Sequence, residues 1–246
     1  MTNTPRSKAF KGAAKPADPS AIAVIADRIG VEKEVLMAVL RVEAPRGPFD
    51  ARGRPVILYE GHVFWRNLSP DLREDANRQR LAWPHWDRTL YPRGGQDPMY
   101  AALERACEID ETAALKACSW GGPQILGENH AMVGFETVQE MVLAFMEGEA
   151  EQIAAFAAYI DAANLEIQLR AKDWAGFAQI YNGPGYTAHR YDERIAEAYA
   201  ELKAAAEATE ATEAPPPPPP PARPARVQAP RSAPPPPPDG GGNGAS

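Results

Sequence analysis

Proline is concentrated at one end of the chain, and this bounds the part that can fold. Of the 26 prolines in 246 residues, 14 follow residue 214, with unbroken runs at 215–221 and 234–238. Such segments favour extended polyproline conformations and cannot bury a core. We therefore predict a folded domain over 18–207 and a disordered Pro/Gly-rich tail over 208–246. The tail would serve as a spacer or as a ligand for a proline-reading domain.

The first 17 residues combine four basic side chains with no apolar stretch, and we predict a flexible basic arm over 1–17. A secretory signal peptide contains an apolar core of about 7–15 residues. A membrane-spanning helix needs about 20 consecutive apolar residues. The sequence has neither pattern, so we expect no membrane span and synthesis in the cytoplasm.

Charge and motif content exclude several classes of function. The net charge is −7, and nucleic-acid binding needs a basic face, so no nucleic-acid partner is expected. The two cysteines and four histidines have no metal-ligand spacing, and we predict neither a metal site nor a cofactor. Neither a GxSxG nucleophile elbow nor a phosphate-binding loop is present.

Hydrophobic periodicity predicts a mainly α-helical domain. Asp18 and Pro19 provide an N-cap and a first helical residue. A turn followed by a β-prone run over 49–59 predicts a small β-hairpin. Residues 69–97 predict a long irregular loop, which in compact domains is often functional. The predicted helices span 18–30, 31–44, 61–68, 98–107, 110–118, 136–147, 149–162, 164–180 and 189–207.

Glu43 is the first candidate for a catalytic group. It follows Val39 by four residues and Leu40 by three, so it continues the apolar face of its predicted helix. Removal from water raises the pKa of a carboxyl, and a raised pKa suits a general acid that works near neutral pH. The structural alternative is an ion pair with Arg41, Arg46 or Arg52.

Three further carboxylates are candidates from their positions. Glu60 ends the β-prone run, where it could equally face solvent or support the next helix. Asp50 lies at the predicted hairpin turn, where aspartate is also common for conformational reasons. Asp97, in the long loop, is the weakest of the three.

Two glycine-rich breaks between predicted elements contain aromatic and amide side chains, and their glycines allow a ligand to come close to the backbone. The breaks are SWGGPQI at 119–125 and YNGPGY at 181–186. Aromatic faces with amides suit sugars, whose rings have apolar faces and hydroxyl edges. Helix termination is the structural alternative for both breaks. The candidate substrate-binding residues are Ser119, Trp120, Gln124, Tyr181 and Asn182 in these breaks, together with Asp50.

Taken in order, four motifs resemble the N-acetylmuramidase family of phage endolysins. They are Glu43 at a helix end, GRPVILYEGHVF at 53–64, SWGGPQILG at 119–127 and YNGPG at 181–185. More distantly they resemble soluble lytic transglycosylases and goose-type lysozymes. The resemblance covers about residues 20–203, and it implies a lysozyme-like, mainly helical fold with a small β element. The family usually has serine after its catalytic glutamate, whereas this chain has Ala44.

The resemblance implies a peptidoglycan hydrolase that cleaves the β-1,4 bond between N-acetylmuramic acid and N-acetylglucosamine, with Glu43 as general acid. An inverting route needs a second carboxylate about 6.5–9.5 Å away, and a retaining route needs one at about 5–5.5 Å. Glu60 is the first candidate for this role and Asp50 the second. Lytic transglycosylation, which needs a single glutamate, is an alternative. A non-catalytic peptidoglycan-binding protein on the same scaffold is another.

The same resemblance suggests how such a protein would reach its substrate. The expected partner is the peptidoglycan glycan strand, bound by a monomer. A chain without an export signal would stay in the cytoplasm until a holin-type protein permeabilised the membrane and released it to the cell wall. Many relatives carry a separate wall-binding domain, and this sequence shows only the proline-rich tail.

Overall fold

Helices make up most of the structure, which is a computed structural model that describes residues 10–183 and 185–213. The mainly helical fold with a small β element is confirmed. The helices are α1 (Pro19–Arg28), α2 (Lys33–Glu43), α3 (Gly61–Asn67), α4 (Pro70–Arg78), α5 (Gln96–Lys116), α6 (Val138–Glu147), α7 (Glu149–Ala162), α8 (Glu166–Ala171), α9 (Trp174–Tyr181) and α10 (Tyr191–Glu213). Three short 3-10 turns, η1 (Arg88–Leu90), η2 (Gly127–Asn129) and η3 (Tyr186–His189), complete the helical content of the described residues.

Local capping explains where several helices begin. The Asp18 side chain accepts a hydrogen bond from the Ser20 amide at 2.7 Å, and Pro19 opens α1, as predicted. Thr137 and Glu140 form a reciprocal capping box at the start of α6. Asp173 caps α9 through the Gly176 amide.

The sheet differs from the predicted hairpin. Strands β1 (Ile57–Tyr59), β2 (Cys118–Trp120) and β3 (Ile125–Leu126) form one antiparallel sheet in the order β1-β2-β3. Leu58 pairs with Ser119, so the partner of β1 lies about 60 residues further along the chain. Within 49–59 a short antiparallel turn forms, with an isolated bridge between Phe49 and Pro55 and a hydrogen bond from the Asp50 amide to the Arg54 carbonyl at 2.8 Å. The predicted small β element is therefore present, but β1 pairs with β2 and not with a strand inside 49–59.

Several helix boundaries also differ from the prediction. The helix predicted over 164–180 is two helices, since Lys172 adopts the left-handed conformation and Asp173 starts α9. Non-helical backbone at Asp110 divides α5 close to the predicted break. The loop predicted over 69–97 contains α4 and η1.

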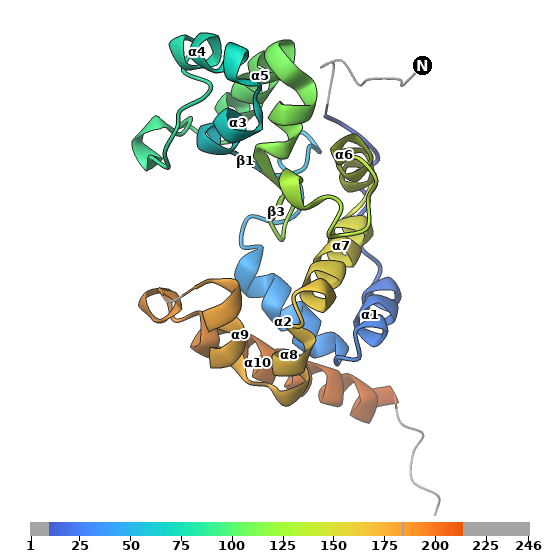
Figure 1. Cartoon of the computed structure of the whole chain (residues 1–246). Helices are drawn as coiled ribbons and strands as arrows, with labels where there is room; N and C mark the ends of the chain where they lie inside the picture. Colours follow the sequence, from blue (N-terminus) through green and yellow to red (C-terminus); the bar gives the residue numbers. More distant parts are fainter. Residues whose placement is uncertain (1–9, 184, 214–246) are drawn as a thin grey trace, which may run out of the picture.

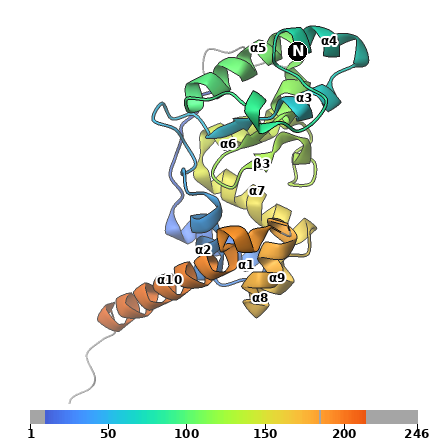
Figure 2. The same ribbon diagram turned by 90° about the vertical axis from the view of Figure 1, so that its left-hand side faces the viewer.

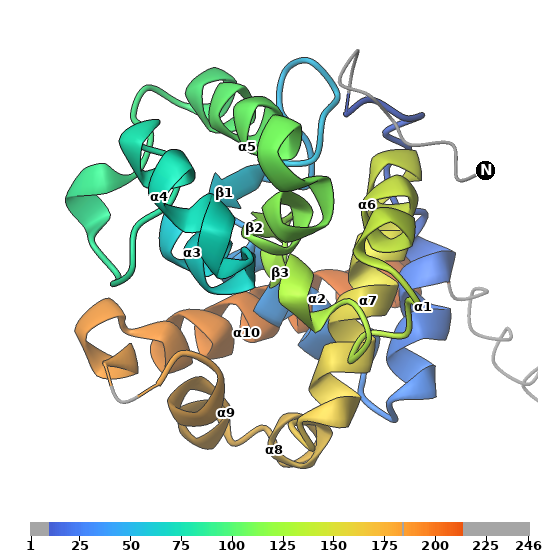
Figure 3. The same ribbon diagram turned by 45° about the horizontal axis from the view of Figure 1, so that its top comes forward.

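The elements are arranged in two halves. Figures 1 and 2 show α3, α4, α5 and the sheet in one half and α1, α2, α8, α9 and α10 in the other, with α7 running between them. Figure 3 shows α1 and α7 side by side, in agreement with their contacts. Helix α10 packs along α2. Because α2 ends where the two halves meet, Glu43, its last residue, lies at that junction.

The described part of the N-terminal segment does not behave as a free arm. Phe10 is 6% exposed, and its ring lies 5.4 Å from that of Tyr100 and 5.8 Å from that of Trp120. The Ala14 amide donates to the Met146 carbonyl at 3.1 Å. The segment is therefore held by apolar burial and backbone hydrogen bonds, which the count of basic residues does not reveal.

The predicted ends of the folded domain are only partly covered by the structure. Helix α10 continues to Glu213, six residues beyond the predicted boundary at 207. Residues 1–9 and 214–246, on which the rest of the predicted arm and most of the predicted tail fall, lie outside the described residues. Across the described residues, no helix combines the length and the apolar character needed to cross a bilayer.

Candidate active site

Glu43 ends α2 and lies between two cavities. We call the first, of about 160 Å³, the inner cavity; Val56, Gly121 and Gly122 contribute to its wall. We call the second, of about 330 Å³, the tyrosine cavity, after Tyr159 and Tyr181 in its wall. Glu43 and Gln124 line both cavities. The carboxyl predicted to be buried therefore faces two neighbouring cavities that share part of their walls.

The surroundings of Glu43 keep its carboxyl protonated to higher pH than usual. Burial raises the pKa of Glu43, and this effect outweighs the hydrogen bond from Asn182 and the charge of Arg194, both of which lower it. The Asn182 amide nitrogen lies 3.2 and 3.3 Å from the two carboxylate oxygens. This is the protonation behaviour that a general acid needs.

The ion-pair alternative for Glu43 is not seen. Among the described residues no arginine lies within 4 Å of its carboxylate: Arg41 instead pairs with Glu201, and Arg52 pairs with Asp97. Asn182, and not the residue that follows Glu43, donates the hydrogen bonds to this carboxylate. The β-carbon of Ala44 instead faces the turn at Gly122.

The second glycine-rich break brings its two candidate residues to this site. Tyr181 is the last residue of α9, and its ring stacks on that of Phe177, with centroids 5.4 Å apart and planes 14° apart. Asn182 follows as the C-cap residue. Within the described structure, its side-chain oxygen is buried without a hydrogen-bond partner. Tyr181 and Asn182 thus belong to the site as predicted from their motif.

The first glycine-rich break is a turn between β2 and β3. Gly121 has φ +74° and Gln124 has φ +54°, both in the left-handed region. The Gln124 side chain donates to the carbonyls of Gly121 at 2.7 Å and Val56 at 3.3 Å. Gln124 therefore joins the turn to the residue that precedes β1, and it faces both cavities.

Gln152 positions this turn, and the sequence analysis missed it. Its side chain is fully buried in α7; its oxygen accepts from the Gly122 amide at 2.9 Å and its nitrogen donates to the Phe145 carbonyl at 3.0 Å. A signal was available, because Gln152 precedes Ala155 and Phe156 by three and four residues on a buried helical face. The same argument, that helical spacing places a polar residue on a buried face, identified Glu43 from the sequence.

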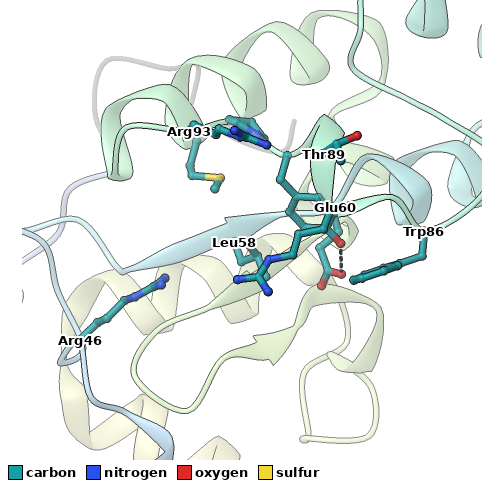
Figure 4. A pocket seen from close by; sticks show the side chains of 10 residues that line it. Arg46, Leu58, Glu60, Trp86, Thr89 and Arg93 are labelled. Atoms are coloured by element: carbon teal, nitrogen blue, oxygen red, sulfur yellow. Dashed lines mark hydrogen bonds between the residues drawn. The ribbon is translucent and has the colours of Figure 1, made fainter.

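Glu60 lies in a different cavity. It accepts hydrogen bonds from the Ser119 hydroxyl at 3.0 Å and the Tyr91 hydroxyl at 3.1 Å, and the His62 ring lies 3.9 Å away. It lines a third cavity of about 740 Å³ together with Leu58, shown in Figure 4. The three residues of β1 separate Val56 from Glu60, and the backbone rises about 13 Å over these four steps. Glu60 therefore lies well along β1 from the inner cavity.

Three predicted substrate-binding residues, Ser119, Trp120 and Asp50, are not presented to the cavities around Glu43. The Ser119 hydroxyl donates to Glu60. The Trp120 side chain is fully buried, and its indole nitrogen donates to the Leu115 carbonyl at 3.0 Å. Asp50 accepts from the backbone and side chain of Arg54, at 2.9 and 2.8 Å. Burial acts to raise the pKa of Asp50, but these hydrogen bonds outweigh it and hold the pKa below its usual value. The Trp120 side chain thus packs in the core, and the Asp50 side chain stabilises its own turn.

Neither a metal site nor a reactive thiol appears among the described residues. No group of three or more His, Cys, Asp or Glu side chains in that part of the chain is placed to hold a metal ion. Cys107 and Cys118 are free thiols. Burial raises the pKa of Cys107 to about 12 and that of Cys118 well above its usual value.

The comparisons with known proteins agree with this geometry. A family model described as N-acetylmuramidase matches residues 32–203. The chain belongs to the N-acetylmuramidase family. The match spans both glycine-rich breaks and Glu43, so the predicted resemblance is confirmed. Membership in the family makes the protein a peptidoglycan-cleaving enzyme.

A solved structure of a phage endolysin is similar to this muramidase. The crystal structure of the Burkholderia AP3 phage endolysin matches with a TM-score of 0.71 and 32% sequence identity. The match covers 80% of this chain and 75% of the endolysin chain. No curated protein sequence matches.

Proposed function

We propose that this muramidase cleaves the β-1,4 bond between N-acetylmuramic acid and N-acetylglucosamine, with Glu43 as general acid. The observation that carries the proposal is the position of Glu43, with its raised pKa, between two cavities. General acid catalysis by one such group contributes about 10²- to 10⁴-fold to a rate. A glycan strand that runs through both cavities would present its linking oxygen to this carboxyl.

The neighbouring side chains fit the remaining needs of sugar binding. Tyr159 and Tyr181 give the tyrosine cavity aromatic walls, which suit the apolar face of a pyranose ring. The Gln124 side chain, which lines both cavities, offers a hydrogen-bonding amide to acetamido groups. In this proposal protonated Glu43 donates to the glycosidic oxygen, and Asn182 holds the resulting carboxylate.

The route after bond cleavage depends on a second group. Inverting hydrolysis uses a carboxylate about 6.5–9.5 Å from the acid to activate water, and Glu60 is our candidate. Hydrogen bonds from the Tyr91 and Ser119 hydroxyls orient its carboxylate. However, the inner and tyrosine cavities contain no carboxylate besides Glu43 among their described lining residues. This observation favours a second candidate function, lytic transglycosylation, in which the C6 hydroxyl of muramic acid attacks C1 and Glu43 acts as acid and then base.

Product analysis separates the two reactions. Purified sacculi would be digested with the wild type, Glu43→Gln and Glu60→Gln, and the released muropeptides analysed by mass spectrometry. Reducing ends indicate hydrolysis, and anhydro-muramic ends indicate transglycosylation. Full activity of Glu60→Gln would remove Glu60 from the mechanism. Binding to sacculi without release of any fragment by the wild type would favour the non-catalytic alternative.

A further inference from the structure

The third cavity, which we call the arginine cavity, concentrates positive charge on an acidic protein. Its wall contains Arg46, Arg88 and Arg93, and none of them has an ion-pair partner among the described residues. The net charge of the chain is −7. Elsewhere in the described structure arginines commonly pair with carboxylates; those that do include Arg41, Arg52, Arg54, Arg66, Arg78, Arg170 and Arg190.

A structured loop presents Arg88, and Arg93 follows two residues after its second anchor, Tyr91. Trp83 is 5% exposed and packs so closely on Gly61 that a β-carbon there would lie 2.2 Å from its ring. Its ring centroid lies 6.0 Å from that of Tyr91, whose hydroxyl donates to Glu60. These two anchors fix both ends of the segment that carries Trp86, Arg88 and the 3-10 turn η1. The cavity is therefore held by packing on the sheet half.

The cavity also offers an apolar surface beside its charges. The Trp86 side chain is 66% exposed, and Figure 4 shows its ring beside the Glu60 carboxylate, with Arg46 on the opposite side. Three guanidinium groups and one carboxylate leave two net positive charges on the lining residues. The Glu60 carboxylate already accepts hydrogen bonds from the Ser119 and Tyr91 hydroxyls. The guanidinium N–H groups of the three arginines therefore remain available to a ligand.

The arginine cavity adjoins the space around Glu43 at one residue. Arg46 lines both the inner cavity and the arginine cavity, so a ligand in the first would lie beside the second. Guanidinium groups bind carboxylates with paired, charge-assisted hydrogen bonds. In intact peptidoglycan the sugars are uncharged, and the free carboxylates belong to the short peptides attached to muramic acid.

We propose that the arginine cavity binds the carboxylates of these peptide stems, with Trp86 covering an apolar part of the peptide. This inference rests on the proposed function, since it takes the glycan strand to lie beside Glu43. It makes the enzyme selective for peptide-bearing stretches of glycan over bare ones. Arg88 and Arg93 contribute to binding affinity and take no part in bond cleavage.

Binding to native and charge-neutralised sacculi tests the proposal. Both proteins would carry Glu43→Gln so that the sacculi stay intact, and Arg88→Gln/Arg93→Gln would be compared with the unsubstituted chain by pelleting. We expect the double variant to bind native sacculi about 10-fold more weakly, since each exposed charge pair contributes a few-fold. Sacculi whose carboxylates were amidated with carbodiimide and ammonia should bind both proteins equally weakly. Arg28→Gln, an exposed arginine on α1 without an ion pair among the described residues, is the matched control and should bind as the unsubstituted chain does.

Three results would overturn the proposal. Equal binding of native and amidated sacculi by the unsubstituted chain would show that carboxylates are not recognised. An equal loss in Arg28→Gln would show that general charge, not the cavity, is responsible. Glycan treated with an amidase lacks peptides but exposes the lactyl carboxylate of muramic acid. If Arg88→Gln/Arg93→Gln still bound this glycan about 10-fold more weakly than the unsubstituted chain, the cavity would be assigned to muramic acid itself. Failure of the proposed function would appear separately, as the absence of released fragments in wild-type digests.

Discussion

At the scale of single residues, the chemistry depends on a carboxyl that folding removes from water. Glu43 lies on the buried face of α2 and at its last turn, so it is partly buried yet faces the cavities. The helical spacing predicted its burial, and the raised pKa agrees with that prediction. Its partner Asn182 lies 139 residues away and could not be inferred from local spacing.

Replacement of Glu43 by glutamine should abolish catalysis and leave the fold intact. We expect the rate of release of muropeptides from sacculi to fall by about 10²- to 10⁴-fold, because the general acid is lost. Glu34→Gln, the same change at the other end of α2, is the matched control and should keep the wild-type rate. Comparable rates for wild type and Glu43→Gln would remove this residue from the mechanism.

The pH dependence should follow the protonation of Glu43. Only the protonated carboxyl donates, so kcat/KM should fall as the pH rises through its raised pKa. The Asn182 hydrogen bond favours the charged form and lowers the pKa. Asn182→Ala should therefore raise the pKa further and move the alkaline limb to higher pH, in a pH profile measured on sacculi. Asn129→Ala, in the same cavity, should leave the limb in place; a shift to lower pH in Asn182→Ala would contradict the assignment.

At the scale of elements, the turn between β2 and β3 depends on a helix that is distant in sequence. Gln152 on α7 holds the Gly122 amide and the Phe145 carbonyl at the end of α6. Helix caps such as Asp18 were predictable because they involve neighbouring residues. The pairing of β1 with β2 was not, because three-residue strands carry little periodic signal and their partners are chosen by packing.

Gln152→Leu should destabilise the protein markedly. The substitution leaves a backbone amide and a backbone carbonyl buried without partners, at a cost of about 2–4 kcal/mol in free energy of unfolding. Urea denaturation followed by circular dichroism would measure the difference. Gln139→Leu on α6, whose side chain bonds only Thr112 at the surface, should change the stability by less than about 0.5 kcal/mol. Similar effects of both substitutions would show that Gln152 has no special role.

At the scale of the whole molecule, the N-terminal segment joins the sheet half to the connection between α6 and α7. Phe10 packs between Tyr100 of α5 and Trp120 of β2, and the following residues bond to the turn between α6 and α7. The Ala17 amide also donates to Glu149 at 2.8 Å.

The expectations of a monomer, of a cytoplasmic origin and of a holin-type partner remain predictions at this scale.

Phe10→Ala should therefore destabilise the domain although it lies near the chain end. The loss of a buried aromatic ring costs about 3–5 kcal/mol in free energy of unfolding, which urea denaturation would detect. Leu143→Ala is a suitable control, since that side chain on α6 is 42% exposed and should contribute less than about 1 kcal/mol. An unchanged midpoint in Phe10→Ala would mean that the segment contributes nothing to stability.

The sequence by itself determined the helical class, several helix starts, the buried position of Glu43 and the resemblance that family membership confirms. These follow from spacing and capping within a few residues. Only the tertiary structure decided that Trp120 serves the core, that Asp50 serves its turn, and that Asn182 and Gln152 support the site. It also gathered Arg46, Arg88 and Arg93 around one cavity. Those outcomes depend on contacts between elements far apart in the chain, which packing selects and local propensity does not encode.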